Sequence, residues 1–381
     1  MGDELTHPDN ANSSSTYKFV SSNFNISYLD GSGASGDYVT DILHIGGQSL
    51  ENFQFGVGYS STASQGVLGV GYPLNEAVVN QNGGQPYPNL PQAMANDGLI
   101  QTPAFSLWLD DLASSTGSIL FGGVNTDKFH GSLQTLPIQP TGQDSSGNYV
   151  YTEFIIALTD LSLTQGGTTT NMSSGQLPVP VVLDSGTSLT YLPDSITQAI
   201  FNAVGAQYDS SQGTAFAPCS LANTNATLDF TFSKPTISVP MNELILTSSG
   251  QVTLSNGESA CVFGIAPAQG SIPILGDTFI RSAYIVYDIA SNQISIAQTN
   301  FNSTQDNIME IGNSIPDATT VSNPVTTINV SGGGAGVAAP LASFTIKVAP
   351  SSTASSRATS MQIPLSMAAG VAGAGLLLAA L

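Results

Sequence analysis

Short runs of alternating apolar and polar residues, separated by glycine-containing turns, fill most of the sequence between residues 17 and 297. Such alternation is typical of strands with one buried face, and Asp-Gly, Asn-Gly and Gly-Gly dipeptides are typical of the turns between them. The clearest runs are residues 24–28, 38–45, 150–161 and 284–296. Helical patterns are short and lie at 90–97 and 195–204. The sequence therefore predicts an all-β protein.

The charge balance excludes several classes of function. The 381 residues contain 26 acidic and 6 basic side chains, for a net charge of −20 at pH 7. A protein that binds nucleic acid or an anionic membrane surface needs a basic patch, which this composition cannot supply. Three histidines and two cysteines, none of them clustered, do not form a zinc-binding pattern. We therefore expect no metal, no cofactor and no nucleic-acid partner.

Several features indicate passage through the secretory pathway. Six Asn-x-Ser/Thr sequons mark candidate glycosylation sites at Asn12, Asn25, Asn171, Asn225, Asn302 and Asn329. Cys219 and Cys261 could form one disulfide in an oxidising compartment, or remain as two buried thiols. We expect the disulfide, because the sequons place the chain in that compartment.

The C-terminal residues resemble a lipid-attachment signal. Residues 351–360 are small and polar, and residues 363–381 are apolar to the last residue. This layout is typical of a GPI-attachment signal; a plain tail anchor is the alternative. The residues after Met1 do not form a signal peptide, since they contain neither a basic start nor an apolar run. We therefore expect the true N-terminus to lie upstream of Met1, and the protein to reside at the cell surface or in a cell wall.

The segment 181–188, Val-Val-Leu-Asp-Ser-Gly-Thr-Ser, carries the strongest candidate for chemistry. An apolar strand here delivers Asp184 into a Ser-Gly turn that has hydroxyl groups close by. A carboxylate at the end of a buried strand is costly unless it is hydrogen-bonded, and the hydroxyls and amides of the turn can supply those bonds. Taken alone, the Asp-Ser-Gly turn favours the simpler interpretation, an Asp that ends a strand and caps a turn.

Four segments together resemble the pepsin-like aspartic proteases, and among these the fungal, GPI-anchored yapsin and candidapepsin type. They are 181–188, 273–281 (Pro-Ile-Leu-Gly-Asp-Thr-Phe-Ile-Arg), the flap-like 26–37, and 66–72 (Gly-Val-Leu-Gly-Val-Gly-Tyr). The resemblance runs from about residue 13 to residue 297. It implies an all-β, bilobal fold whose N-terminal lobe is incomplete, and an endopeptidase that cleaves peptide bonds at acidic pH through a water activated by aspartate.

The resemblance also implies roles for individual residues. Asp184 would be the second catalytic carboxylate, and the Cys219–Cys261 disulfide would lie in the second lobe. The residues that it places against the substrate are Tyr28, Asp30, Gly31 and Ser32 in the flap and Gly186, Thr187 and Ser188 beside Asp184. No cofactor is implied, and the partner is a peptide or protein substrate bound by a monomer.

One requirement of this chemistry is not met by the chain. Two aspartates must share a proton, yet Asp184 is the only Asp followed by Ser/Thr-Gly in the 381 residues. The acids upstream of Tyr28 lie outside any such turn. We therefore expect the chain, as an N-terminally truncated sequence, to be inactive by itself. The alternatives are a catalytically dead homologue that binds peptides, or a GPI-anchored structural protein of the cell wall.

The expected organisation follows from these segments. It comprises a partial N-terminal β-lobe with the flap at 1–140, a C-terminal β-lobe with Asp184 at 141–299, a Ser/Thr/Gly-rich stalk at 300–360 and the attachment signal at 361–381. A weak internal similarity between residues 65–71 and 272–277 favours two related β-lobes, because both segments place two aliphatic residues and a glycine at the end of a buried strand.

Overall fold

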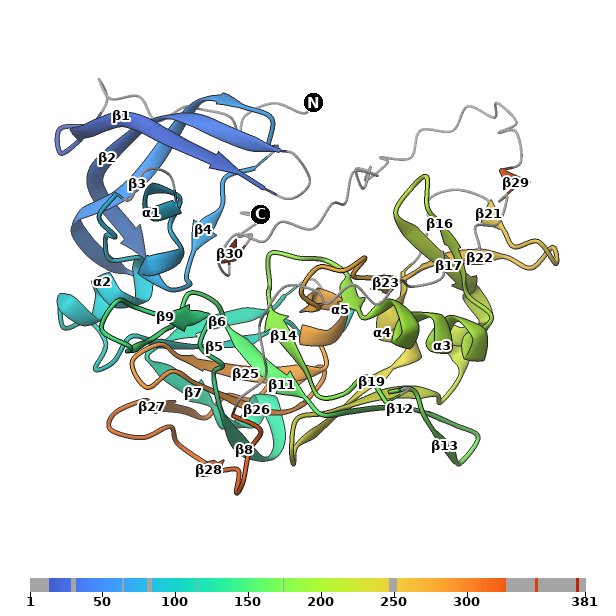
Figure 1. Cartoon of the computed structure of the whole chain (residues 1–381). Helices are drawn as coiled ribbons and strands as arrows, with labels where there is room; N and C mark the ends of the chain where they lie inside the picture. Colours follow the sequence, from blue (N-terminus) through green and yellow to red (C-terminus); the bar gives the residue numbers. More distant parts are fainter. Residues whose placement is uncertain are drawn as a thin grey trace.

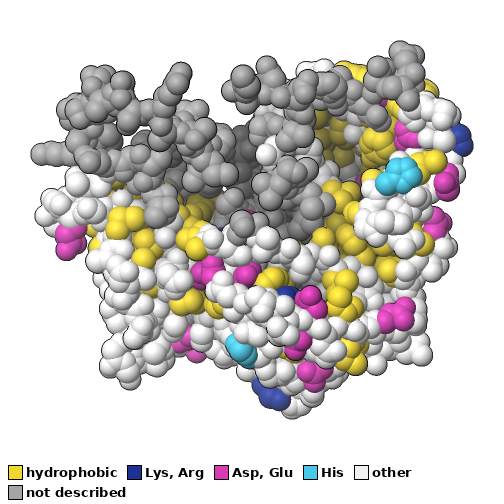
Figure 2. Space-filling model, turned by 180° about the vertical axis from the view of Figure 1, so that it is seen from behind, with side chains coloured by type: hydrophobic (Ala, Val, Ile, Leu, Met, Phe, Trp, Pro, Cys, Tyr) yellow, Lys and Arg dark blue, Asp and Glu magenta, His cyan; other side chains and the backbone are white. Residues whose placement is uncertain are grey.

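Strands make up most of the regular structure, and the prediction of an all-β protein is confirmed. The structure is a computed structural model that describes residues 14–28, 32–63, 65–80, 84–114, 116–173, 175–246 and 252–326, with two short strands at 347–348 and 375–376. In these parts of the chain, no helix is both long and apolar enough to cross a membrane. Figure 2 shows acidic side chains scattered over one face of the molecule, as the net charge of −20 leads one to expect.

A six-stranded sheet connects the first and second halves of the chain (Figure 1). In spatial order its strands are β28 (Ala318–Thr320), β8 (Phe129–Pro137), β26 (Gln293–Thr299), β25 (Ala283–Asp288), β5 (Ala104–Trp108) and β6 (Ser118–Phe121). Both β5 and β25 are buried along their whole length, because the sheet is covered on both faces. The two halves therefore share one continuous layer instead of meeting only through side chains.

A five-stranded sheet carries Asp184. In spatial order its strands are β11 (Ile155–Leu158), β14 (Val179–Leu183), β24 (Ile274–Leu275), β15 (Thr190–Leu192) and β23 (Ile265–Pro267). β14 lies between an antiparallel neighbour, β11, and a parallel neighbour, β24. The last three residues of β14 are buried, as expected for an apolar strand with a partner on each side.

Two four-stranded sheets complete the second half. One has the order β13 (Thr168–Asn171), β12 (Asp160–Gln165), β18 (Thr227–Thr231) and β19 (Thr236–Pro240); the other has β16 (Gln207–Asp209), β17 (Thr214–Pro218), β22 (Ala260–Phe263) and β20 (Ile245–Leu246). Their apolar faces join a large core cluster that also receives Leu183 and Leu275. The core of the second half thus lies directly beneath the strands that lead to Asp184.

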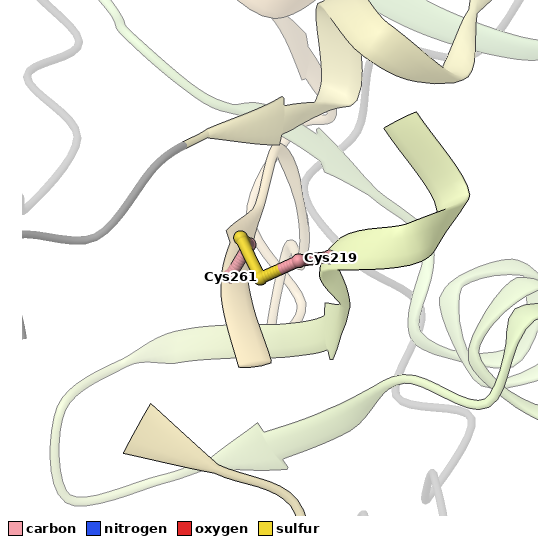
Figure 3. Close-up of a disulfide and its surroundings, with 2 residues drawn as sticks. All are labelled: Cys219 and Cys261. Carbon is pink, nitrogen blue, oxygen red and sulfur yellow. A yellow bond between two sulfur atoms is a disulfide. The ribbon is translucent and has the colours of Figure 1, made fainter. Parts of the chain in front are cut away.

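The Cys219–Cys261 disulfide is present, as predicted (Figure 3). Cys261 lies in β22, and Cys219 begins the 3₁₀ helix η3 (Cys219–Asn223) directly after β17. Ala217 and Cys261 are paired residues of β17 and β22, so the disulfide closes the end of an existing strand pair.

The helices are few and short. They are α1 (Ala77–Asn80), α2 (Leu90–Asn96), α3 (Asp194–Val204), α4 (Met241–Leu244) and α5 (Asp277–Ile280), with the 3₁₀ helices η1 (Pro73–Asn75) and η2 (Thr126–Lys128). The two helices predicted at 90–97 and 195–204 are confirmed as α2 and α3. α3 buries Ile196, Ile200 and Val204 on one face and ends at Gly205, whose φ of 73° is a left-handed conformation that favours glycine.

The N-terminal part contains a separate three-stranded sheet, at the upper left of Figure 1. Its strands are β1 (Lys18–Ser27), β2 (Gly33–Ile45) and β3 (Gln48–Ser61). A small cluster that includes Leu50, Leu90 and Met94 packs α2 against this sheet. β4 (Leu68–Gly69) is only partly buried and pairs, among the described residues, with β30 (Gly375–Leu376). The first of the two similar segments therefore does not end a buried strand, whereas the second ends the buried β24.

The folded region extends beyond the boundary expected at residue 300. β27 (Ile308–Glu310) pairs with β7 (Gly123–Asn125), and β28 joins the edge of the six-stranded sheet beside β8. Ile311 and Ile315 are buried in a core cluster with Val124 and Leu133. A stalk beginning at 300 was therefore wrong, because apolar residues at 311–321 supply a further edge of the core. The remaining described pairs are β9 (Gly142–Gln143) with β10 (Tyr149–Val150), and β21 (Val252–Thr253) with β29 (Lys347–Val348).

Candidate active site

Asp184 directly follows β14 and is 3% exposed. The backbone N–H of Gly186 donates to Asp184 Oδ1 at 2.9 Å, and the Thr187 hydroxyl donates to Oδ2 at 2.6 Å. Both carboxylate oxygens thus accept a bond from the turn that follows. The turn is closed by a further bond from the Thr187 N–H to the Asp184 carbonyl, at 3.2 Å. The Ser-Gly-Thr sequence is therefore the local reason that Asp184 can be held in a buried position.

The segment 274–278 supports this turn from the next strand. β24 runs parallel to β14, with Leu275 opposite Leu183, and the Asp184 N–H donates to the Leu275 carbonyl at 3.2 Å. The N–H of Asp277 donates to the Thr187 carbonyl at 2.8 Å. The two sequence segments singled out in the second half therefore form one unit.

Gly276 allows this close approach. A Cβ atom at this position would lie 2.2 Å from the Thr187 carbonyl oxygen and 2.3 Å from that of Leu189. Both contacts are with backbone, so neither can be relieved by a side-chain rotation. We expect Gly276→Ala to lower the free energy of unfolding by about 2–3 kcal/mol.

Urea unfolding of the purified variant measures this effect. Gly142→Ala is a matched control, because a Cβ at Gly142 would meet no atom within 4 Å. Equal stability of the two variants would show that the approach of segment 274–278 to the turn is not tight.

The site holds more than one carboxyl group. Burial raises the pKa of Asp184, against hydrogen bonds from Thr187 and Gly186 that lower it. Burial and repulsion from Asp184 raise the pKa of Glu153 to about 7. Burial also raises the pKa of Asp277 to about 7; Arg281 lowers it and Asp184 adds to the rise. Burial and then the charge of Asp184 raise the pKa of Tyr287. A site of this kind keeps protons on some of its carboxyls in weak acid.

The other residues predicted beside Asp184 differ in exposure. Gly186 and Ser188 are exposed, whereas Thr187 is 4% exposed and its hydroxyl is bonded to Asp184. Thr187 therefore holds the carboxylate in place through its hydroxyl. Contact with a substrate stays a prediction for Gly186, Thr187 and Ser188.

The predicted flap segment forms a hairpin. β1 and β2 are antiparallel, with Ser27 opposite Gly33, and the Tyr28 N–H donates to the Ser32 carbonyl at 2.8 Å. Tyr28 is half-buried. Asp30 and Gly31 lie outside the described residues, and the substrate-binding role of the hairpin stays a prediction.

Three charged residues at or near the site were not found from the sequence. Glu153 precedes β11, Asp277 begins α5, and Glu243 in α4 is fully buried. Asp277 lies within the segment 273–281, which was singled out from the sequence for its resemblance to the family, but Asp277 was given no role of its own. No linear pattern marks Glu153, because its closeness to Asp184 depends on the pairing of β11 with β14.

The sequon asparagines that the structure describes, Asn25, Asn171, Asn225 and Asn302, are all exposed. Asn12 and Asn329 lie outside the described residues. Exposure allows glycosylation, which stays a prediction.

Comparison with known proteins assigns the family. A family model described as eukaryotic aspartyl protease matches residues 7–299, which is more than half of the chain. The probable aspartic-type endopeptidase opsB of Aspergillus oryzae is 53% identical over 375 residues, covering 96% of this chain and 75% of the relative. The protein of the same name in Aspergillus fumigatus is 57% identical over 331 residues, covering 86% and 67%.

A solved structure agrees with the fold. The aspartic proteinase from Irpex lacteus matches with a TM-score of 0.59 at 24% identity, covering 77% of this chain and 86% of the other. At this identity the match supports the fold alone, whereas the family rests on the sequence matches. The chain belongs to the eukaryotic aspartyl protease family.

Proposed function

We propose that Asp184 is one of two carboxyl groups with which an aspartic endopeptidase hydrolyses peptide bonds in acid. The observation that carries this proposal is the position of Asp184. It follows a buried strand, is 3% exposed, and accepts one hydrogen bond on each carboxylate oxygen from its own turn. A carboxylate held in this way has a fixed orientation and can act as a general base toward a water molecule.

The reaction needs a second carboxyl group opposite Asp184. One carboxylate removes a proton from the attacking water while the other, protonated, donates to the oxygen of the peptide carbonyl. No second Asp-Ser/Thr-Gly turn occurs in the 381 residues. We infer that this chain supplies one catalytic aspartate and that it does not cleave peptides unless a second aspartate faces the first.

The buried carboxyl groups of the site make the folded state more stable in acid than at neutral pH. Glu153 and Asp277 have a pKa of about 7 in the folded chain and an ordinary pKa near 4 when unfolded. The folded state therefore binds more protons than the unfolded state between these values. The contribution of these two groups to the free energy of unfolding is therefore largest below their unfolded pKa, near 4, and falls as the pH rises toward 7.

The substrate that we propose is a peptide in extended conformation. The hairpin of β1 and β2, closed by the bond from Tyr28 to Ser32, is the element that would cover it. Gly186 and Ser188 are exposed beside Asp184 and would contact it. If supplying a second aspartate does not produce catalysis, the alternative function, a peptide-binding protein without activity, takes its place.

A chimera tests this function. In the opsB relative of Aspergillus oryzae, the region aligned over 375 residues is replaced by the matching part of this chain, and the remaining quarter of the relative, which we expect to supply the second aspartate, is kept. We expect the chimera to cleave an unfolded protein between about pH 3 and pH 5, with inhibition by pepstatin. A folded chimera without pepstatin-sensitive cleavage would contradict the proposal, provided that the unmodified relative is active in the same assay.

The secretory and cell-surface location stays a prediction from the sequence. The exposed sequon asparagines and the disulfide are consistent with an oxidising compartment. The structure does not describe the side chains of residues 363–381, the apolar tail that we expect to form the GPI-attachment signal.

A further inference from the structure

The pairing of β11 with β14 brings a second carboxyl group to Asp184 from the same half of the chain. The antiparallel register pairs Ile155 with Val182. It continues one residue further, because the Leu183 N–H donates to the Phe154 carbonyl at 3.0 Å. Counting one residue further along both segments sets Glu153, in the bend before β11, opposite Asp184.

Opposite residues of an antiparallel pair project to the same face of the sheet, with Cβ atoms about 4.5–5.5 Å apart. The register therefore points to side chains of Glu153 and Asp184 that start on the same face of the sheet. The chain bends at Glu153, just before β11 begins, so this residue ends the paired region as Asp184 does on its own strand. Both residues therefore lie at the same end of the paired strands β11 and β14.

The two carboxyls interact through their charges. Asp184 is 3% exposed, Glu153 is half-buried, and repulsion from Asp184 is one cause of the raised pKa of Glu153. Two neighbouring carboxyls that are largely shielded from water cannot both ionise without a large cost.

We propose that Glu153 and Asp184 form a carboxyl pair that holds one proton over the weakly acidic range, with the proton on Glu153 and the charge on Asp184. This pair goes beyond the proposed function, because that function concerns Asp184 and a second catalytic aspartate and gives Glu153 no role. Glu153 acts here as a positioning residue: its neutral carboxyl stands beside the carboxylate that serves as base and keeps a second negative charge away from it.

The hydrogen bonds at the site explain which carboxyl keeps the proton. Asp184 accepts bonds from Gly186 and Thr187, which stabilise its charged form. The pKa of Glu153, raised to about 7 by burial and then by Asp184, has no such lowering contribution. The other titratable groups that interact with Asp184 are Asp277, from α5, and Tyr287, from β25. The positive charge of Arg281 lowers the pKa of Asp277, against the rise caused by burial.

The test uses the 381-residue chain and does not depend on turnover. Glutamate labelled with ¹³C at the side-chain carboxyl reports the titration of each Glu by NMR, and the loss of a signal in Glu153→Gln assigns Glu153. We expect its midpoint near pH 7 in the wild type. In Asp184→Asn, which removes the neighbouring charge, the midpoint should fall by about one pH unit or more.

Glu76 supplies an internal control in the same spectra. Burial raises its pKa to about 8, and its bonding partner is the N–H of Tyr87, in the first half of the chain. Its midpoint should be the same in the wild type and in Asp184→Asn, which shows that the fold is intact.

The reciprocal experiment covers the case in which Asp184→Asn does not fold. With aspartate labelled instead, the Asp184 signal of the wild type should show a second, smaller step near pH 7, where Glu153 loses its proton. Glu153→Gln should abolish this step and leave the main midpoint of Asp184 nearly unchanged, because glutamine is as neutral as the protonated Glu153. An unchanged midpoint for Glu153 in folded Asp184→Asn, or a second step of Asp184 that persists in folded Glu153→Gln, overturns the proposal. Either result leaves the proposed endopeptidase function in place, because that function is measured by cleavage.

Discussion

Replacing Asp184 by asparagine should reduce peptide cleavage by the chimera by about 10³-fold or more, within the range for a positioned acid–base group. Asparagine has nearly the same shape and keeps one oxygen that can accept from Gly186 or Thr187. It has no carboxylate with which to remove a proton from water. The melting temperature should therefore stay close to that of the unmodified chimera while turnover is lost.

Asp97→Asn is the matched control for this change. Asp97 is exposed and ends α2, in the first half of the chain. Activity is measured as initial rates of cleavage at pH 4, and stability as a thermal unfolding curve. If Asp184→Asn kept a rate comparable to that of Asp97→Asn, Asp184 would have no part in the reaction.

Replacing Glu243 by alanine should lower the free energy of unfolding by about 3–5 kcal/mol, the cost of leaving a buried charge without its partner. Glu243 is fully buried, and its Oε2 accepts from Arg281 Nε at 2.7 Å. The same carboxylate accepts from the backbone N–H of Leu112, in the first half of the chain, at 3.0 Å. The change removes both bonds and leaves the Arg281 side chain, 11% exposed, without its ion-pair partner.

Denaturant unfolding of the 381-residue chain measures this loss. Glu258→Ala is the control, because Glu258 is an exposed glutamate in the same half of the chain. Glu243→Gln keeps the shape of the side chain but removes its charge. Its free energy of unfolding should lie between those of the wild type and Glu243→Ala, because the amide oxygen still accepts a hydrogen bond while the ion pair is lost. A Glu243→Ala variant as stable as Glu258→Ala would mean that the bond between the halves does not stabilise the fold.

The features that could be predicted from the sequence are those that depend on neighbouring residues. Asp184 was singled out because its strand and hydroxyl-rich turn are continuous in the chain, and its role was assigned because this segment, together with three others, resembles the pepsin-like proteases. The hydrogen bonds to Asp184 follow the local order of the turn. The hairpin at Tyr28 and the helices α2 and α3 were found for the same reason. In each case the periodicity or turn chemistry of a short segment determines the structure.

The features that could not be predicted depend on which distant segments pair. Glu153 lies beside Asp184 only because β11 is antiparallel to β14 in one particular register. Glu243 bonds Leu112 across 131 residues of sequence. The strands at 308–310 and 318–320 lie in a Ser/Thr-rich region, and their pairing with β7 and β8 is set by the core that they complete. A single sequence contains no signal for such pairings.

The most direct test of the central claim is cleavage of an unfolded protein in acid by the 381-residue chain and by the chimera, side by side, with and without pepstatin. If catalysis needs a second aspartate facing Asp184, the chimera cleaves the substrate, pepstatin stops it, and the 381-residue chain shows no cleavage above background. Pepstatin-sensitive cleavage by the 381-residue chain alone would contradict the account, because Asp184 would then be acting without a second aspartate from an Asp-Ser/Thr-Gly turn.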